Sequence, residues 1–405
     1  SKEMADAATA VKHGMGELML YTIIFLITGT AGVLLSKVQY QTAAMGKWGV
    51  HFFWKPWFVN TGMFVGMCLC LIHESINRCN AKKSAEKVAP KPPHRRATEG
   101  GDKKKRTPLF WLVALPGLCD FVATYFMNVG LLWIPTSVWQ MLRGSIVIFT
   151  AFVRLTLLKL KIKKSEWLGV GIVTVSLMFV GVVGAYAPTA EPDNPDIVLP
   201  VPTTTQRGWG VVLVIVAQAV QALQTVIEEW LLHDVEASSS MIVGLEGFWG
   251  AVACIVVALP LAQMGATFQN DGDGLHENTE DTFIMLGNSP LLLWTTVAYV
   301  LVLLFFNLYG MEITDMTNAV SRNILEGVRT LFIWAAGLAL HQLASSYGEI
   351  WCYPWSYLEL VGFLILTVGL FYFYGVFKVK KWEVSDDDEE PLLFEGPPLG
   401  APVNV

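Results

Sequence analysis

The stretch WQMLRGSIVIFT, from Trp139 to Thr150, places one arginine in a segment that is otherwise apolar enough for lipid. A helix that crosses a bilayer needs roughly 20 mostly apolar residues, because the hydrocarbon core is about 30 Å thick. A charge at that depth costs at least ~2.5 kcal/mol on insertion scales, so it normally faces other helices or a wet cavity. Arg143 therefore predicts a membrane helix with one polar, inward-facing side.

The whole chain has this membrane character. Its 405 residues are 53% hydrophobic and only 15% charged, whereas soluble domains are about 25% charged, and its mean hydropathy is +0.48. Ten segments are long and apolar enough to span a bilayer. They are residues 18–37, 56–76, 108–132, 136–158, 167–187, 209–232, 240–264, 289–311, 316–340 and 357–378. The predicted fold class is therefore an all-α integral membrane protein with ten transmembrane helices.

Basic residues are shared unequally between the loops. If both termini are cytosolic, the cytosolic segments hold twenty Lys and Arg residues, and the opposite side holds only Lys47, Lys55 and Arg207. Because Lys and Arg accumulate on the cytosolic side, this distribution predicts cytosolic termini. The basic loop 77–107 is then a topology determinant that also touches anionic membrane lipid, and no nucleic-acid partner is expected. On the other side, the acidic segment 271–281 is expected to form turns.

Ten spans with both ends on one side divide into two halves of five that are inverted relative to each other. Inverted repeats of this kind are common in secondary transporters. MLRG at 141–144 in the fourth span is similar to ILEG at 324–327 in the ninth. The predicted organisation is a tail at 1–17, a first five-helix repeat at 18–187, a lumenal linker at 188–208, a second five-helix repeat at 209–378 with an acidic lumenal loop at 265–288, and an acidic disordered tail at 379–405.

Polar side chains recur inside the spans at intervals of three or four residues. At this spacing they share one face of a helix, and the lipid forces such a face toward the bundle interior. We therefore expect a common polar cavity near the middle of the membrane. The candidate substrate-binding residues are Asp120, Thr124, Asn128, Gln140, Arg143, Gln221, Gln224, Arg322, Glu326 and Arg329.

Several of these residues allow two interpretations. Arg143 either pairs with Asp120 or Glu326 and only fixes how the two halves dock, or it attracts an anionic group at a substrate site. Asp120 and Glu326 are also candidates for proton-coupling carboxylates, because burial and a nearby arginine act in opposite directions on a carboxyl group. The glutamines of the sixth span either line a pore or form hydrogen bonds between helices.

The sequence contains no recognisable enzyme or metal-binding motif. The seven histidines are scattered, and HExxH, paired CxxC, GxSxG and phosphate-loop patterns are all absent from the chain. We therefore expect no catalytic residues, no metal and no cofactor. Most of the six cysteines fall within predicted spans, which argues against a disulfide framework.

Three segments of the chain resemble a known transporter family. They lie at 115–152, which contains QMLRG, at 221–232, which reads QALQTVIEEWLL, and at 318–340, which contains NILEGVRT. They are similar to the F branch of the solute carrier 35 family, within the drug/metabolite transporter superfamily, and more distantly to chloroquine-resistance-transporter-like proteins. The resemblance implies inverted five-helix repeats, alternating access, and cavity positions for Asp120, Gln140, Arg143, Glu326 and Arg329.

The C-terminal tail suggests where the protein resides. Residues 385–400 are too charged and too rich in Pro and Gly to pack a core. Asp388, Leu392 and Leu393 fit the acidic dileucine pattern that sorting adaptors bind, which favours the endosome, lysosome or vacuole membrane over the Golgi. We expect a secondary transporter, monomeric or homodimeric, that moves a small polar or charged organic solute, with proton coupling as one option. The alternatives are a Golgi nucleotide-sugar antiporter and a non-transporting membrane receptor or scaffold.

Overall fold

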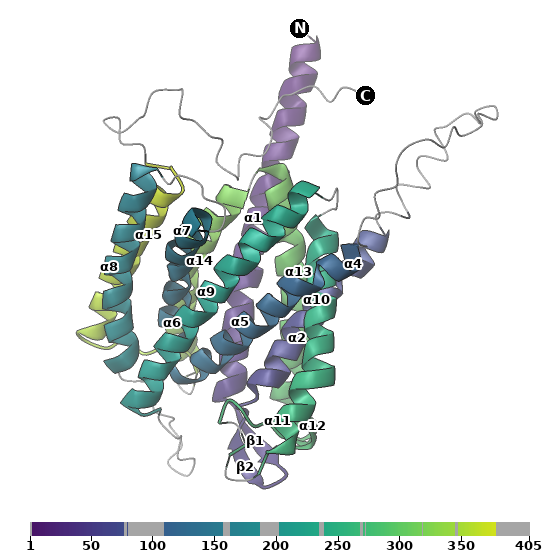
Figure 1. The fold of residues 1–405 in the computed structure, drawn as a ribbon, viewed down its shortest axis with the longest axis vertical. Coiled ribbons are helices and arrows are strands. Elements are labelled where there is room, and N and C mark those ends of the chain that lie inside the picture. Colours follow the sequence, from purple (N-terminus) through teal and green to yellow (C-terminus); the bar gives the residue numbers. More distant parts are fainter. Residues whose placement is uncertain are drawn as a thin grey trace, which may run out of the picture.

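The computed structural model of the protein describes residues 2–76, 79, 109–156, 163–186, 202–234, 239–267, 270, 271, 273–317, 319–344 and 347–377. Within this part of the chain, ten helical segments have the length and composition of membrane spans. They stand side by side as a bundle (Figure 1). The predicted all-α membrane fold and its ten spans are thereby confirmed.

Most spans are built on one long helix. The long helices are α1 (Lys2–Gln41), α5 (Ala114–Trp133), α8 (Lys164–Tyr186), α9 (Thr204–Asp234), α13 (Pro290–Met316), α14 (Ala319–Leu343) and α15 (Trp355–Phe373). The shorter helices α2 (Pro56–Cys68) and α4 (Leu109–Leu112) begin the second and third spans, and α12 (Thr279–Asn288) lies outside the spans.

Two spans change helix type along their length. The fourth consists of α6 (Thr136–Leu142), the 3₁₀ turn η1 (Arg143–Ser145) and α7 (Ile146–Thr156). The seventh consists of α10 (Ser239–Val252), the π-helical segment η2 (Ala253–Ala258) and α11 (Leu259–Met264). Such changes within a helix often mark functional hinges. In the fourth span the change begins at Arg143, the arginine that the sequence singles out.

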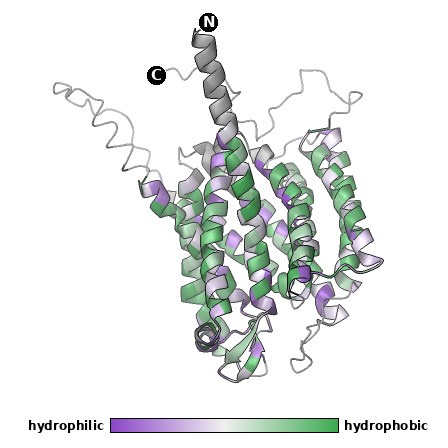
Figure 2. Ribbon diagram, turned by 180° about the vertical axis from the view of Figure 1, so that it is seen from behind, coloured by the Kyte–Doolittle hydropathy of each residue, from purple (hydrophilic) through white to green (hydrophobic). Residues whose placement is uncertain are grey.

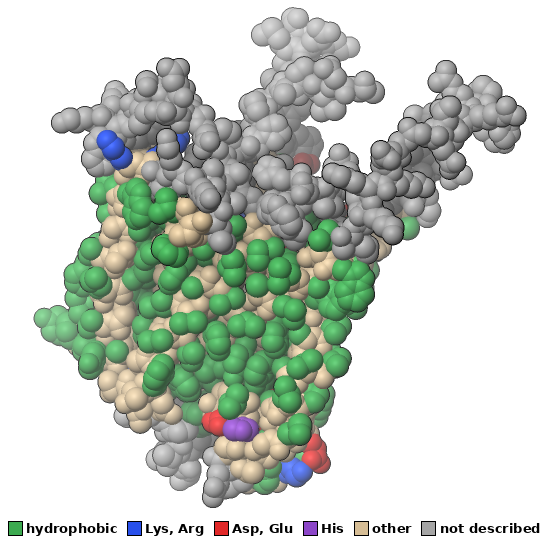
Figure 3. Space-filling view, in the orientation of Figure 1, with side chains coloured by type: hydrophobic (Ala, Val, Ile, Leu, Met, Phe, Trp, Pro, Cys, Tyr) green, Lys and Arg blue, Asp and Glu red, His purple; other side chains and the backbone are tan. Residues whose placement is uncertain are grey.

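The outer surface of the bundle is apolar on the face that Figure 3 shows, and Figure 2 shows that hydrophobic residues predominate along its helices. Ile23, Met178 and Trp294 are among many large hydrophobic side chains that are at least half exposed. Soluble proteins rarely expose a continuous apolar surface of this extent, whereas the hydrocarbon of a bilayer matches it. The bundle is therefore covered by the side chains that lipid requires.

Each helix packs against several others, and five of these contacts are α1 with α13, α2 with α10, α5 with α9, α6 with α14, and α8 with α15. Glycines allow the closest of these contacts. A Cβ atom on Gly169 of α8 would lie 2.6 Å from the Phe373 amide nitrogen of α15, and one on Gly247 of α10 would lie 2.6 Å from Cβ of Met67 on α2. Small residues at helix interfaces let backbones approach each other in this way.

A short β-hairpin joins α1 to α2. Strands β1 (Ala43–Gly46) and β2 (Gly49–Phe52) pair antiparallel, and Gly49, with φ of 115°, closes the turn in the conformation that favours glycine. We call the membrane side that carries this hairpin the hairpin side. The opposite side, where α1 begins, is the N-terminal side (Figure 1).

The turns predicted for residues 271–281 are wrong at the end of that segment. Helix α12 begins at Thr279, and the side chain of Asn278 caps it by accepting a hydrogen bond of 3.0 Å from the Asp281 amide. Asp, Asn and Gly favour turns, but Asn is also among the best helix N-caps. The same residue types therefore predict either structure when they are read alone.

Candidate functional site

The 3₁₀ turn in the fourth span presents Arg143 to the ninth span. The Arg143 guanidinium lies 5.3 Å from the centre of the Trp139 ring and donates a hydrogen bond of 3.4 Å to Gln140 Oε1. The adjacent Gly144 packs against α15, where a Cβ would lie 2.7 Å from Cδ1 of Leu366. The turn is thus fixed on one side by close packing, while Arg143 reaches toward α14.

Glu326 of α14 lies between two arginines. Its carboxylate is 3.1 Å from Nη2 of Arg329, one turn along the same helix, and 3.9 Å from Nη2 of Arg143. The side chains of Arg143 and Glu326 are 25% and 24% exposed, whereas Arg329 is 2% exposed. Of the two partners that the sequence offers for Arg143, the structure places Glu326 beside it. We call Arg143, Glu326 and Arg329 the charged cluster.

Arg329 is the most deeply buried member of the charged cluster. Its guanidinium lies 4.7 Å from the ring centre of Phe306 and 6.0 Å from that of Phe25, distances typical of cation–π contacts. Gly29 of α1 leaves the room for it, because a Cβ there would come within 2.7 Å of Cδ of Arg329. Nε of Arg329 has no hydrogen-bond partner among the described residues. Aromatic faces and one carboxylate therefore hold this charge.

A second group of candidate residues lies on α5. Asp120, Thr124 and Asn128 are all buried, and the Thr124 hydroxyl donates a hydrogen bond of 3.0 Å to Asp120. The Asn128 amide donates a hydrogen bond of 3.5 Å to the side-chain oxygen of Asn60 on α2. The Asn60 amide nitrogen in turn lies 3.8 Å from Sγ of Cys254. This group connects α5 with α2 and η2, whereas the charged cluster connects η1 with α14. The structure thus divides the candidates between two places.

The remaining candidates lie around these two groups. On α9, Gln224 is buried and Gln221 is half-buried, and the neighbouring Gln218 lies 3.2 Å from Sδ of Met127 on α5. Arg322 is half-buried on α14, and a Cβ on Gly310 of α13 would lie 3.3 Å from its Cζ.

The sorting motif at Asp388, Leu392 and Leu393 lies outside the described residues.

On the hairpin side, buried residues and hydrogen bonds lie between the helix ends and the charged cluster. All seven residues of α6, from Thr136 to Leu142, are buried. The Glu349 carboxylate accepts hydrogen bonds from the Ser137 amide and hydroxyl, at 2.7 and 2.6 Å. Lys37 of α1 donates bonds of 2.6 and 2.9 Å to the carbonyls of Leu131 and Ile134 at the end of α5. We call Lys37, Ser137 and Glu349 the hairpin-side seal.

The seal is built by the usual chemistry of helix ends. The first N–H groups and the last carbonyl groups of a helix lack partners within the helix. A carboxylate therefore suits the N–H groups at the start of a helix, and an ammonium suits the carbonyl groups at its end. The sequence shows Lys37 only as the end of an apolar run, and Glu349 only as an acid between two spans. A charged residue next to a span end is the one available signal, and it does not identify the partner.

Known proteins are similar to this chain over most of its length. The chain is 30% identical to mouse Solute carrier family 35 member F6 over 382 residues, which cover 91% of this chain and 94% of the relative. It belongs to the F branch of the solute carrier 35 family. The human protein of the same name is also 30% identical, over 87% of each chain, and an uncharacterised fission-yeast protein, from Schizosaccharomyces pombe, is 27% identical over 66% of this chain. No family model matches the sequence. This chain is thus a multi-pass membrane protein of a solute-transporter family.

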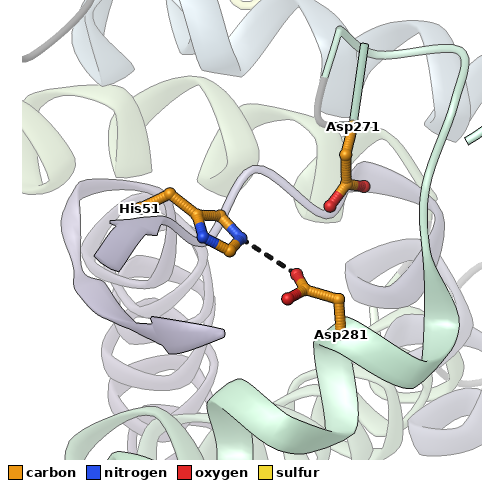
Figure 4. A group of neighbouring side chains, drawn as sticks. All are labelled: His51, Asp271 and Asp281. Carbon is orange, nitrogen blue, oxygen red and sulfur yellow. Dashed lines mark hydrogen bonds and ion pairs between the residues drawn. The ribbon is translucent and has the colours of Figure 1, made fainter. Parts of the chain in front are cut away.

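Outside the spans, this solute carrier has a buried ionic cluster that holds the hairpin and Lys55 to the loop before α12 and to the first turn of α12. Lys55 is 1% exposed, and its ammonium lies 2.5 Å from Asp271 and 2.9 Å from Asp281. His51 of β2 lies 2.9 Å from Asp281 (Figure 4). The Glu277 carboxylate accepts bonds of 2.8 and 3.0 Å from the first amides of α2. We call these five residues the hairpin clasp.

Charges within the hairpin clasp shift the pKa values of its members. Burial would raise the pKa of Asp281, but hydrogen bonds from His51 and Lys55 outweigh it and hold that pKa well below its usual range. The bond to Asp281 in turn raises the pKa of His51. Burial raises the pKa of Glu277 to about 8, although Lys55 and the backbone amides that donate hydrogen bonds to Glu277 act to lower it.

Part of the hairpin clasp has the donor atoms of a metal site. Ligand atoms of His51, Asp271 and Asp281 lie within 4.8 Å of one another. However, the buried ammonium of Lys55 already bonds to both carboxylates. A divalent cation would have to displace this ammonium, so the arrangement serves as a clasp between two segments that are more than 200 residues apart in the sequence.

Proposed function

We propose that this chain is a secondary carrier that moves a small polar or charged organic solute by alternating access, with its substrate site at the charged cluster. The observation that carries the proposal is the partial exposure of Arg143 and Glu326, each about a quarter exposed within the spans. Charged groups at this depth are tolerated when they pair or face a wet cavity. A cation and an anion that both remain accessible offer a solute two points of attachment.

The packing of the helices supports the two-repeat organisation at 18–187 and 209–378. Five of the observed helix contacts join spans one and eight, two and seven, three and six, four and nine, and five and ten. If every span is exchanged for the one five places away, this set of pairs is unchanged. A pseudo-two-fold axis between inverted repeats has this property, and rocking about such an axis is how many carriers alternate access.

The hairpin-side seal supports a conformation that is accessible from the N-terminal side. Between the seal and Arg143, every residue of α6 is buried. The distribution of basic residues supports a cytosolic location for the N-terminal side, so the cluster would face the cytosol in this conformation. A cytosolic tail would expose the dileucine pattern to sorting adaptors, and we therefore place the carrier in an endosomal, lysosomal or vacuolar membrane.

The arrangement also bears on which acid would carry a proton. Glu326 interacts with Arg143, Arg322 and Arg329, an environment suited to permanent ion pairing more than to repeated release of a proton. Asp120 lies on α5 and accepts a hydrogen bond of 3.0 Å from the Thr124 hydroxyl. Of the two proton-coupling candidates in the sequence, Glu326 is therefore the less suited to the role, and Asp120 stays a candidate.

Transport by purified protein in liposomes tests the proposal. A thermal-shift screen of organic anions, cations, zwitterions and nucleotide sugars comes first, because a ligand at about 100 times its Kd stabilises the folded state by about 2.7 kcal/mol. Uptake of each stabilising compound is then measured for the wild type and for Arg143→Ala and Glu326→Gln. Glu246→Gln is the matched control, because Glu246 is a buried glutamate in the seventh span.

We expect Arg143→Ala and Glu326→Gln to abolish uptake while Glu246→Gln retains it. Normal uptake by both cluster variants would show that the substrate binds elsewhere. Stabilisation by nucleotide sugars alone would favour an antiporter of those compounds. If no compound moves under any gradient, the chain acts as a receptor or scaffold and the proposal fails.

A further inference from the structure

A carboxyl group that the sequence does not single out lies near the hairpin-side seal. Glu359 is in the second turn of α15, inside a membrane span, and is only 7% exposed. Its Oε1 atom has no hydrogen-bond partner, and the described residues contain no ion pair to it. A buried polar atom without a partner costs about 1–3 kcal/mol. What Glu359 does therefore depends on its neighbours.

This carboxyl lines a small cavity between α6, α14 and α15. Met141, Leu331 and Phe363 supply apolar walls, and Thr330 and Trp334 line the side formed by α14. The cavity measures about 10 Å³, which is room for about one water molecule. The site is therefore too small for an organic solute, and its size fits a proton with at most one water.

The second carboxyl belongs to the hairpin-side seal. Glu359 interacts electrostatically with Glu349 and has the Ser137 hydroxyl and Trp334 as neighbours. The Ser137 hydroxyl already donates to Glu349 at 2.6 Å, so one serine lies between the two acids. Burial raises the pKa of Glu349, against opposing effects of Ser137 and Lys37. Two acids thus face a single cation.

The surroundings of the pair contain few other charges. From α1, Lys37 acts on Glu349, while its ammonium bonds to two carbonyls of the α5 end. From α6, Ser137 is the polar neighbour, and from α14 the neighbours are Trp334 and Thr330. The remaining titratable group at this end of α14 is His341, and its Nδ1 lies 3.3 Å from the Tyr347 carbonyl oxygen. Two neighbouring carboxyl groups tend to share a proton when the one nearby cation, here Lys37, forms its hydrogen bonds with other groups.

We propose that Glu349 and Glu359 form a proton-binding site that controls the hairpin-side seal, an inference that rests on the alternating access proposed above. With one proton bound, the two carboxyls lie side by side and Glu349 holds the first turn of α6. When the proton leaves, two negative charges repel each other, Glu349 withdraws from Ser137, and the seal opens. The proton comes from water on the hairpin side and returns to it, so no other reactant is needed.

Infrared spectroscopy of the full chain in lipid nanodiscs detects the proton without any solute. The pH-difference spectrum of the wild type should contain a carbonyl band of a buried carboxylic acid. Glu359→Gln should remove or shift this band, and Glu349→Gln should do the same. Glu246→Gln, a buried glutamate on α10, should leave it unchanged. A band that is the same in Glu359→Gln as in the wild type overturns the proposal.

The native Cys352, half-buried in the loop that carries Glu349, reports opening of the seal. At one mildly alkaline pH, its modification by a polar thiol reagent should be several-fold slower in Glu359→Gln than in the wild type, because a neutral amide removes the repulsion. Equal rates overturn the proposed control of the seal. If both readouts behave as expected and no solute is transported, the carrier function alone fails. If solutes move and both readouts are unchanged by Glu359→Gln, the proton site alone fails.

Discussion

Replacing Lys55 by methionine should strongly destabilise the protein. The ammonium is 1% exposed and bonds to Asp271 and Asp281, which are 3% and 0% exposed. Methionine fills most of the same volume, so the main change is the loss of one buried positive charge from between two negative ones. Removing one partner of a buried ion pair costs about 3–5 kcal/mol, since the other is left without compensation. We expect the free energy of unfolding to fall by about this amount.

The measurement is the free energy of unfolding in mixed micelles, obtained by titration with a denaturing detergent. Lys47→Met is the matched control, because the Lys47–Glu280 pair has the same chemistry but side chains that are 41% and 64% exposed. Exposed pairs of this kind contribute about 0–1 kcal/mol. The double variant Lys55→Met with Asp271→Asn should recover part of the loss, since it leaves one uncompensated carboxylate instead of two.

The pH dependence of the Lys55→Met variant provides an independent check. Without Lys55, the folded-state pKa of Asp281 should rise, because burial raises it and one of the hydrogen bonds that hold it down is lost. The folded state then binds protons more tightly, so the loss of stability should shrink in acid and grow as pH rises. A variant that is no less stable than Lys47→Met, or whose defect does not depend on pH, would refute the account of the hairpin clasp.

Three further predictions concern single residues. His51→Gln should destabilise the protein more in acid than in alkali, because a raised pKa in the folded state gives stability that is present below the unfolded value of about 6.5 and lost as pH rises through the folded one; unfolding at several pH values measures this. Gly29→Ala should displace Arg329 and cost about 1–3 kcal/mol through overpacking, with a larger loss of uptake than Gly287→Ala, where a Cβ meets nothing within 4 Å. At a pH above the Glu277 pKa of about 8, Glu277→Gln should cost about 1–3 kcal/mol because its amide group cannot accept from both first amides of α2, and detergent titration at that pH measures this loss.

The spans could be predicted from the sequence because they depend on local properties. Length and apolar composition decide whether a segment crosses lipid, and both are read within one window of the chain. The structure accordingly places helices at all ten predicted spans, although the sixth begins at Thr204, five residues before the predicted start. Helix ends are less certain because capping and loop contacts fix them.

The charged contacts could be predicted only in part. Arg143 and Glu326 stand out because each is a charge within an apolar segment, but only the packing of α6 on α14 shows that they are partners. Glu349 and Ser137 are 212 residues apart, and no pattern near either residue indicates the other. For the hairpin clasp, composition correctly shows an acidic segment, but the buried lysine that compensates it lies more than 200 residues away.

The fourth span connects the two places where the proposed transport cycle has its charged contacts. Its first helix, α6, is a buried segment of 7 residues, or about 10 Å of rise. Glu349 holds one end through Ser137, and Arg143, at the other end, lies beside Glu326. A short helix with intact backbone hydrogen bonds moves as a unit, so release of the seal should also change the separation of Arg143 and Glu326. The 3₁₀ turn that follows is where the span can bend without moving α7. Opening on the hairpin side and rearrangement of the charged cluster would then be one motion of one helix.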